Sequence, residues 1–510
     1  MVSRSTRGGN METRTVVAPT GEAPQLKSNA ITFVSNLVIG VASTAPGFSL
    51  AATVGYIILV PGVGIHAPAV MLVSFIPMFC VAYAYRWMNK ADTDAGTTFS
   101  WVTKAMGPHL GWIAGWGLLV ADLVVMATQS QIAGAYSLDL FGITKTTLLI
   151  TLIGVAWIII MTAICYIGIE LSARTQQGLL LAEILTLVAF AVVAFIKVYT
   201  DSPVGSIHVA ANWFNPFAVS SPSAMLDGVL LGVFLYWGWD SGVSVNEETV
   251  DGANAPGKAA VLSTVLLLLI YVMVTAAAQS FSGTKPLTDN ADDIFTTGLG
   301  HAVLGDGWDK LLIIAVLSSS AAATQTTILP AARTALSMAR KKAVPAFLGE
   351  IHPEHQTPGP ATWLFGLISI VWFVAVNQTS QNVLGDSLTA CGFLVCFYYA
   401  FTGYACVIFF RRELLKSAKN LFFVGLLPLV GAVALTGVFV KAVSFYSDPN
   451  NGACVNDRCA SAFGMGLPLV IGIGALLLGV VGMLYANFAH RAFFKENRPE
   501  VADPGVLTAD

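Results

Sequence analysis

Charged side chains are scarce in this chain. Only 11% of its 510 residues are Asp, Glu, Lys or Arg, whereas 55% are hydrophobic. A water-soluble domain carries roughly 25% charged residues to cover its surface. The composition therefore excludes a surface that faces mainly water, and it predicts that lipid covers most of the molecule.

The sequence also lacks basic tracts and clusters of metal ligands. The formal net charge is −3, and no run of Lys and Arg could follow a phosphate backbone, which argues against nucleic acid as a partner. The 7 histidines and 7 cysteines show no ligand spacing. Gly252–Lys258 comes close to a phosphate-binding loop, but Ala259 lacks the hydroxyl that would hold magnesium. We expect no catalytic site, no metal and no cofactor.

Long apolar runs are what the chain has instead. A helix needs roughly 20 apolar residues to cross a bilayer core of about 30 Å. Twelve stretches meet this requirement, which predicts an all-α integral membrane protein of about twelve transmembrane helices. Their approximate limits are 31–58, 67–88, 109–135, 146–168, 177–199, 225–249, 259–281, 309–338, 361–377, 389–410, 420–442 and 465–487.

The placement of basic residues predicts how these spans are oriented. If both termini are cytoplasmic, 20 of the 26 lysines and arginines fall in cytoplasmic segments, as the positive-inside rule requires. A missed span would move the later basic clusters to the other side and remove this bias. We therefore expect a multi-pass protein of the plasma membrane with both termini in the cytoplasm.

Two spans contain residues that interrupt a helix. The first holds Gly40–Gly47 with Pro46 inside it, and the sixth holds Tyr236–Gly242 with Gly238 and Asp240 inside it. Unpaired backbone groups in hydrocarbon cost several kcal/mol each, so they are tolerated where they line a cavity. Ordinary Pro/Gly kinks are the alternative interpretation. The matched positions favour a carrier whose solute binds at broken helices.

The spacing of the breaks also predicts the domain organisation. They lie five spans apart, and an odd offset means that the second unit crosses the membrane in the opposite direction, as in inverted-repeat carriers. The expected order is a disordered cytoplasmic tail at 1–26, a first five-span repeat at 27–199, an inverted second repeat at 200–412, two accessory spans at 413–487 and a cytoplasmic tail at 488–510.

Four motifs carry a resemblance to a known family. They are Gly40–Phe48 in the first span, Ala95–Phe99 followed by Gly107–Trp112 at the entry to the third, Glu247–Pro256 after the sixth, and Arg333–Arg340 after the eighth. With these motifs, residues 28–410 resemble the amino acid–polyamine–organocation permease superfamily. The resemblance implies secondary active transport of a small organic solute by alternating access. A channel would require a repeated pore motif or rings of charge, whereas a nutrient receptor on the same fold stays open.

The resemblance implies that the solute binds at the two breaks. The candidate binding residues are Ser43, Thr44, Ala45, Gly47, Tyr236, Trp237, Gly238 and Asp240. An amino acid is the expected solute. Pro46 stands where the family often has a glycine whose amide holds a substrate carboxylate, so a polyamine or other organic amine is the open alternative, with Asp240 facing the ammonium group.

A carboxylate in the fifth span is the candidate for ion coupling. Glu183 lies among apolar residues, and acids inside a membrane are functional candidates by default. It also matches the place where some members of the family have a lysine. Proton coupling through Glu183 is the preferred hypothesis. A sodium ion held by Glu183, Ser319 and Ser320 is the rival, as is a structural carboxylate that bonds to the first break; symport and exchange both stay open.

Two cysteines lie in one predicted outer loop. Cys454 and Cys459 are separated by four residues, and a loop on the oxidising side of the membrane favours a disulfide between them. Two free thiols are the alternative.

Overall fold

The structure is a computed structural model, and it describes residues 24–291, 293–295, 298–379, 383–451, 454–455, 458–459, 461–503 and 507. Most of the predicted N-terminal tail lies outside these residues. Most of the described residues are helical and very few are in strands, which confirms the all-α membrane fold class.

Eleven segments of the described chain are long and apolar enough to cross a membrane. The helices that form them are α1 (Phe33–Ser43) with α2 (Pro46–Leu59), α3 (Ala67–Ala91), α5 (Pro108–Leu140), α6 (Thr147–Ile167), α7 (Ile169–Thr200), α9 (Ala255–Ser282), α12 (Lys310–Arg340), α13 (Gly359–Thr379), α14 (Val383–Phe409), α16 (Leu427–Tyr446) and α17 (Leu467–Ala489).

The sixth expected span, at 225–249, is not among these eleven segments. It consists of α8 (Pro222–Tyr236), then the 3₁₀ turns η4 (Trp239–Gly242) and η5 (Asn246–Glu248). A helix of 15 residues rises only about 22 Å, so α8 alone is too short to cross. The sixth expected span is therefore present as a broken segment beside eleven candidate spans.

Short elements lie between and beside the long helices; two of them, α15 and η8, begin the span that α16 completes. The helices are α4 (Thr98–Met106), α10 (Lys285–Asp289), α11 (Leu299–Leu304), α15 (Ala418–Asn420) and α18 (Arg491–Glu496), and the tighter or wider turns are η1 (Gly64–His66), η2 (Ala211–Phe214), η3 (Pro216–Ala218), η6 (Ala346–Gly349), η7 (Leu414–Lys416), η8 (Leu421–Leu426) and η9 (Pro449–Asn451). The strands form two antiparallel pairs, β1 (Cys454–Val455) with β2 (Arg458–Cys459) and β3 (Ser461–Ala462) with β4 (Met465–Gly466).

Local chemistry explains where several helices begin. The first backbone N–H groups of a helix have no partner inside the helix, and short hydroxyl side chains accept from them. Thr32, Thr146 and Ser221 do so at the starts of α1, α6 and α8, with N···O distances of 3.1–3.2 Å to the N–H groups. These three residues therefore mark the N-terminal ends of α1, α6 and α8.

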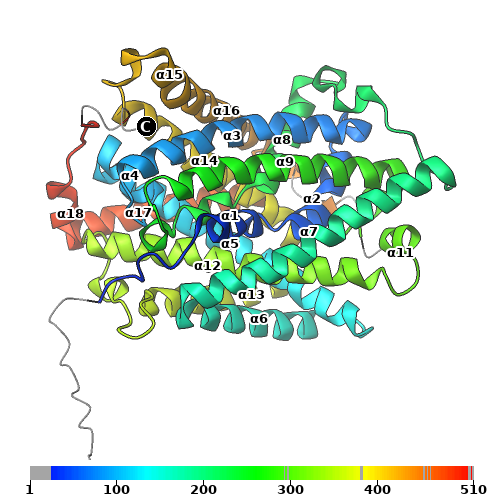
Figure 1. Cartoon of the computed structure of the whole chain (residues 1–510), viewed down its shortest axis with the longest axis horizontal. Helices are drawn as coiled ribbons and strands as arrows, with labels where there is room; N and C mark the ends of the chain where they lie inside the picture. Colours follow the sequence, from blue (N-terminus) through cyan, green and yellow to red (C-terminus); the bar gives the residue numbers. More distant parts are fainter. Residues whose placement is uncertain are drawn as a thin grey trace, which may run out of the picture.

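The helix contacts repeat with an offset of five spans (Figure 1). α3 packs against α9, and these are the second and seventh spans. α5 packs against α14 just as α12 packs against α7, and α3 contacts α14 just as α9 contacts α7. Such paired contacts are what two inverted five-span repeats produce. The residue limits of the repeats remain predictions.

The last spans and the C-terminal segment contact helices of both expected repeats, since α16 also packs on α3 and α17 on α5. α16 and α17 both pack on α14. Beyond α18 the backbone returns to the bundle, where Glu500 donates its N–H to the Lys104 carbonyl at 2.7 Å and Ala502 donates to the Phe409 carbonyl at 3.0 Å. The described part of the expected tail at 488–510 is thus in contact with α4 and α14.

Candidate functional site

The two broken segments meet at the centre of the bundle. Ser43, the last residue of α1, shares a hydrogen bond of 2.7 Å between its hydroxyl and that of Ser241 in η4. Gly238 has a φ of +119°, and a Cβ added there would lie 2.6 Å from the Ser43 carbonyl oxygen. No other residue fits so close an approach with that backbone conformation.

The first break is a single left-handed residue between two helices. Ala45 has a φ of +47°, and Pro46 begins α2. Proline suits the first position of a helix because it has no N–H to satisfy. Around the break, the Thr44 hydroxyl donates to the Val41 carbonyl at 2.7 Å, and the Ser49 hydroxyl donates to the Thr44 carbonyl at 2.6 Å.

Glu183 of α7 binds the N-terminal end of α2. Its Oε1 accepts the Gly47 N–H at 2.6 Å and the Ser319 hydroxyl at 2.8 Å. Ser319 of α12 in turn accepts the Phe48 N–H at 3.1 Å. The Glu183 side chain is fully buried, and its Oε2 has no partner among the described residues. One carboxylate thus connects α2, α7 and α12.

Ser320 does not join this group. Its hydroxyl donates to the Gln129 carbonyl of α5 instead. Neighbouring positions on a helix point about 100° apart, so two consecutive serines cannot both face Glu183. Of the three residues that sequence analysis singled out for ion coupling, the structure brings Glu183 and Ser319 together and directs Ser320 elsewhere.

Tyrosine hydroxyls hold Asp240. Its Oδ1 accepts from Tyr399 at 2.9 Å, and its Oδ2 accepts from Tyr398 at 3.0 Å and from Tyr85 at 3.5 Å. Trp237 donates its indole N–H to the Tyr398 hydroxyl. Hydrogen bonds to the charged form of a carboxylate favour that form, so this arrangement suits an anionic Asp240.

A second buried carboxylate lies near the first. Asp122 lies on α5, which packs against α14, the helix that carries Tyr398 and Tyr399. Its Oδ2 has no hydrogen-bond partner among the described residues, and the side chain is 3% exposed. Among the same residues, neither acid forms a salt bridge with Lys, Arg or His.

Three residues at the breaks keep a small accessible area. Ser43 is 8% exposed, Trp237 6% and Asp240 5%, although they lie at mid-span where many neighbours have no accessible surface. Tyr236 is different: it is fully buried, and its ring packs on Tyr271 with ring centroids 5.1 Å apart. Of the expected binding residues, Ser43, Trp237 and Asp240 therefore keep some accessible surface, and Tyr236 is part of the buried packing.

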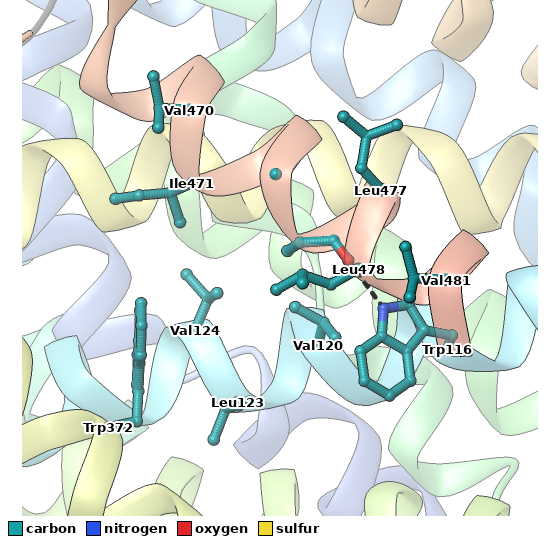
Figure 2. Close-up of a pocket in the computed structure, with 12 residues that line it drawn as sticks. Trp116, Val120, Leu123, Val124, Trp372, Val470, Ile471, Leu477, Leu478 and Val481 are labelled. Carbon is teal, nitrogen blue, oxygen red and sulfur yellow. Dashed lines mark hydrogen bonds between the residues drawn. The ribbon is translucent and has the colours of Figure 1, made fainter. Parts of the chain in front are cut away.

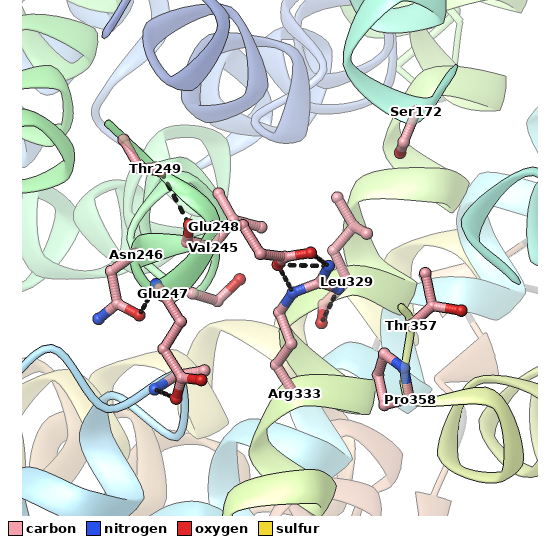
Figure 3. Close-up of polar contacts among 12 residues, drawn as sticks. Ser172, Val245, Asn246, Glu247, Glu248, Thr249, Leu329, Arg333, Thr357 and Pro358 are labelled. Carbon is pink, nitrogen blue, oxygen red and sulfur yellow. Dashed lines mark hydrogen bonds and ion pairs between the residues drawn. The ribbon is translucent and has the colours of Figure 1, made fainter. Parts of the chain in front are cut away.

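Two ion pairs join α12 to the loop that follows the second break, and Figure 3 shows the first of them. Arg333 of α12 donates from Nε and Nη2 to the two carboxylate oxygens of Glu248, at 2.6 and 2.9 Å. Arg340, two turns further along α12, pairs with Glu247 at 2.9 Å. The segment before α1 joins this loop through Ile31, whose N–H donates to the Glu248 carbonyl at 2.9 Å.

Asp94 adds a third contact at the same end. Burial alone would raise the pKa of this carboxyl, but the Lys341 ammonium at 3.0 Å and hydrogen bonds from Ser337, Ser100 and the Gly96 N–H outweigh burial and lower the pKa to about 2. Asp94 therefore stays ionised and ties the loop before α4 to α12.

An apolar groove of about 780 Å³ lies away from the breaks (Figure 2). It is lined by α5, α13 and α17, with Trp116, Trp372 and Leu478 among its walls. Trp116 uses its indole N–H for the Ala475 carbonyl at 2.9 Å. With hardly any polar group to offer, the groove suits hydrocarbon and cannot hold a charged solute.

The structure describes only the backbone of the two cysteines in the predicted disulfide. Cys454 and Cys459 are directly opposite each other in the register of β1 and β2, while their side chains lie outside the described residues. The disulfide stays a prediction. Within the part of the chain that the structure describes, no group of three or more His, Cys, Asp or Glu residues could hold a metal ion.

Sequence reasoning missed the tyrosines around Asp240. Tyr85, Tyr398 and Tyr399 are fully or almost fully buried in otherwise apolar spans. Adjacent tyrosines inside a membrane helix carry hydroxyls that need partners, and that signal was present in the sequence. Their common partner could not be read from it, because Asp240 lies more than 150 residues from each.

Comparison with known proteins identifies similar sequences. A family model described as "Amino acid permease" matches residues 28–456. The Bacillus subtilis branched-chain amino acid permease BcaP is 23% identical over 342 residues, covering 62% of this chain and 70% of the relative. The Escherichia coli low-affinity putrescine importer PlaP is 23% identical over 381 residues, covering 74% and 81%.

The family match settles the class of the protein. It spans both breaks, the Glu183 contact and the ion pairs at the end of the bundle. Proteins of this family are permeases, which are membrane transporters and not enzymes. The resemblance found in the four motifs is confirmed, and the chain belongs to the amino acid permease family.

Proposed function

We propose that the protein is a secondary active transporter that moves a small solute bearing an amino group, an amino acid or an organic amine, across the plasma membrane by alternating access. The observation that carries the proposal is the contact between the two breaks, where Ser43 meets Ser241 and Asp240 keeps a small accessible area. Broken helices at mid-span are where carriers of this type bind solute and ion.

In this proposal some candidate residues bind the solute and others bind the coupling ion. The backbone from Ser43 to Gly47 and from Tyr236 to Gly238 would form the wall of the solute site, with Asp240 facing the amino group. The relatives whose names specify a branched-chain amino acid or putrescine share an amino group as the common chemical feature of their solutes.

Proton coupling through Glu183 fits the contacts better than sodium coupling. Glu183 Oε1 and its neighbour Ser319 accept the N–H groups of Gly47 and Phe48. A hard cation requires a shell of oxygen ligands, and N–H groups aimed at the same point repel it. A proton on Glu183 would instead weaken the charge-assisted bond to Gly47 and free α2 from α7 and α12.

The ion pairs of Glu247 and Glu248 suggest which end is closed. Both lie beside the basic residues Arg333 and Arg340 of α12, and the excess of basic residues favours a cytoplasmic position for that end and for both termini. The structure would then correspond to a state whose cytoplasmic gate is shut.

Transport in reconstituted vesicles tests the proposal. An inwardly directed proton gradient should drive accumulation of a labelled solute without sodium. Glu183→Gln should abolish that accumulation and keep solute exchange, because glutamine cannot carry the proton. Accumulation that requires sodium and ignores pH would refute proton coupling. A Glu183→Gln protein that accumulates solute as the parent does would make Glu183 structural.

A further inference from the structure

The C-terminal segment, residues 491–503, folds back onto one end of the bundle. Figure 1 shows its helix, α18, at the same end as α4. Phe493 of α18 has no accessible surface, and its ring stacks on that of Phe99 in α4 with ring centroids 5.7 Å apart. The same buried cluster contains Trp112 of α5 and Met338 of α12. One side chain of the C-terminal segment thus packs with helices from both expected repeats.

Beyond α18 the backbone connects two further helices. The Glu500 N–H donates to the Lys104 carbonyl of α4 at 2.7 Å, and the Ala502 N–H donates to the Phe409 carbonyl at the end of α14 at 3.0 Å. Ala502 is buried as well. Because α4 lies in the expected first repeat and α14 in the second, three consecutive residues of the C-terminal segment link the two.

The segment also supports the charged contacts at this end. Phe99, on which Phe493 stacks, carries the Lys341 ammonium 5.6 Å from its ring centroid. Lys341 pairs with Asp94 at 3.0 Å, and the N–H of the residue after Asp94 donates to Glu247 at 3.0 Å. The ring of Phe493 therefore lies behind the pair that ties the loop before α4 to α12.

Alternating access would move one repeat against the other. If the repeats separate at this end, the contacts of residues 491–503 with α4 cannot all persist together with those to α12 and α14. A group that binds only one arrangement of a protein shifts the equilibrium toward that arrangement. The C-terminal segment has the contacts to do so from within the chain.

We propose that residues 491–503 form an autoinhibitory clasp, which holds this end of the bundle closed and has to release before the end opens. The inference rests on the proposed transport by alternating access and adds a regulatory element to it. Two backbone hydrogen bonds and one buried ring anchor the clasp, so substitutions at these anchors should raise the population of the open state.

A buried thiol reports opening in the full-length protein. Ser244 lies between the second break and Glu247 and has no accessible surface, and Ser244→Cys nearly preserves its size. A water-soluble maleimide can reach this thiol in detergent solution only when the end opens, and mass spectrometry of peptides locates the label. Cys391 of α14 is buried too and monitors global unfolding in the same sample.

Two proline substitutions form a matched pair. Ala502→Pro deletes the N–H that donates to Phe409, and it should raise the labelling rate of Ser244→Cys about fivefold, the effect of one hydrogen bond. Asp503→Pro is the control. The Asp503 N–H donates no hydrogen bond within the described part of the chain, so the rate should change less than twofold. Equal rates in the two variants overturn the clasp.

A second pair acts at α18 and does not depend on the proline variants. Phe493→Ala removes the ring that stacks on Phe99 and should raise the labelling rate of Ser244→Cys at least tenfold. Lys495→Ala, on the exposed face of α18, should leave the rate unchanged. If Phe493→Ala is labelled like the parent, or if Cys391 is labelled as fast as the reporter, the clasp is wrong.

This measurement also separates the clasp from the transport proposal, because labelling requires no solute. If the reporter thiol reacts at the same rate in the parent and in every variant, the clasp alone fails and alternating access stands. If the thiol reacts only after denaturation in all of them, this end does not open, and alternating access fails together with the clasp.

Discussion

Arg333 and Glu248 form a buried ion pair with two parallel hydrogen bonds, although 85 residues separate them in the chain. Their side chains are 2% and 0% exposed, and the pair joins α12 to the loop that follows the second break. A charged pair without solvent is stabilising only while both partners are present. This relationship makes the closed end of the bundle sensitive to single substitutions.

We predict that Arg333→Gln destabilises the protein by about 3–5 kcal/mol, because it leaves the Glu248 carboxylate buried without a counter-charge. The measurement is the unfolding midpoint in detergent, together with thiol labelling of a cysteine introduced in η5, which should become faster. Arg340→Gln is the control. Its pair with Glu247 is partly exposed, so the loss should stay below about 1 kcal/mol. Equal effects of the two substitutions would contradict the prediction.

Gly238→Ala should abolish uptake. The new Cβ would lie 2.6 Å from the Ser43 carbonyl oxygen, at a φ of +119° that L-residues avoid, so the two breaks would be pushed apart. Uptake into vesicles is expected to fall more than tenfold while membrane insertion persists. Gly178→Ala in α7 is the matched control, because nothing lies within 4 Å of its added Cβ. Normal uptake by Gly238→Ala would mean that the breaks need not touch.

Tyr399→Phe should weaken solute binding by about tenfold. The hydroxyl donates to Asp240 Oδ1, and hydrogen bonds to charged groups contribute roughly 1.5–3 kcal/mol. Without it, ionised Asp240 is less stabilised and binds an ammonium group less well. Tyr404→Phe on the same helix is the control, since Tyr404 bonds to Thr436 of α16 and not to the site. Similar affinities in all three proteins would argue against a solute at Asp240.

The lowered pKa of Asp94 predicts how the free energy of unfolding depends on pH. Its folded-state pKa of about 2 lies below the ordinary value of 3.8, so its ionised form contributes stability above about pH 4 that disappears as pH falls toward 2. Asp94→Asn should therefore lower the free energy of unfolding by about 2 kcal/mol at pH 7.

The difference between Asp94→Asn and the parent should shrink between pH 4 and pH 2, as followed by denaturant unfolding. Asp289→Asn removes only an exposed pair with Lys285 and should have no measurable effect at any pH. A gap between Asp94→Asn and the parent that is constant across this pH range would assign the loss to packing instead of charge.

The loop disulfide remains to be tested chemically. Cys454 and Cys459 face each other across two short strands, and mass spectrometry of the non-reduced protein should find a peptide that links them. The link should add little stability, since so short a loop restrains little chain entropy. Cys391 and Cys396, buried in α14, serve as the internal control and should react with a thiol reagent only after denaturation. Labelling of Cys454 and Cys459 without reductant would show free thiols.

The sequence determined the features that depend on local chemistry. Apolar runs fixed the spans, because a helix that crosses hydrocarbon must satisfy its own backbone. Pro46 and Gly238 located the two breaks, since one lacks an N–H and the other permits a positive φ. The membrane fold and the permease family followed from these residues and from the motifs around them.

Tertiary structure decided which residues face each other. The motif that contains Glu247 and Glu248 and the motif that contains Arg333 and Arg340 were separate patterns in the sequence, yet they pair across the closed end. Likewise, only the packing of the helices determines that Ser319 and not Ser320 donates to Glu183. It also determines that tyrosines of α3 and α14 donate to Asp240. The physical reason is that each helix can rotate and shift against its neighbours without changing its apolar pattern, so contacts between distant residues are set by how the whole bundle packs.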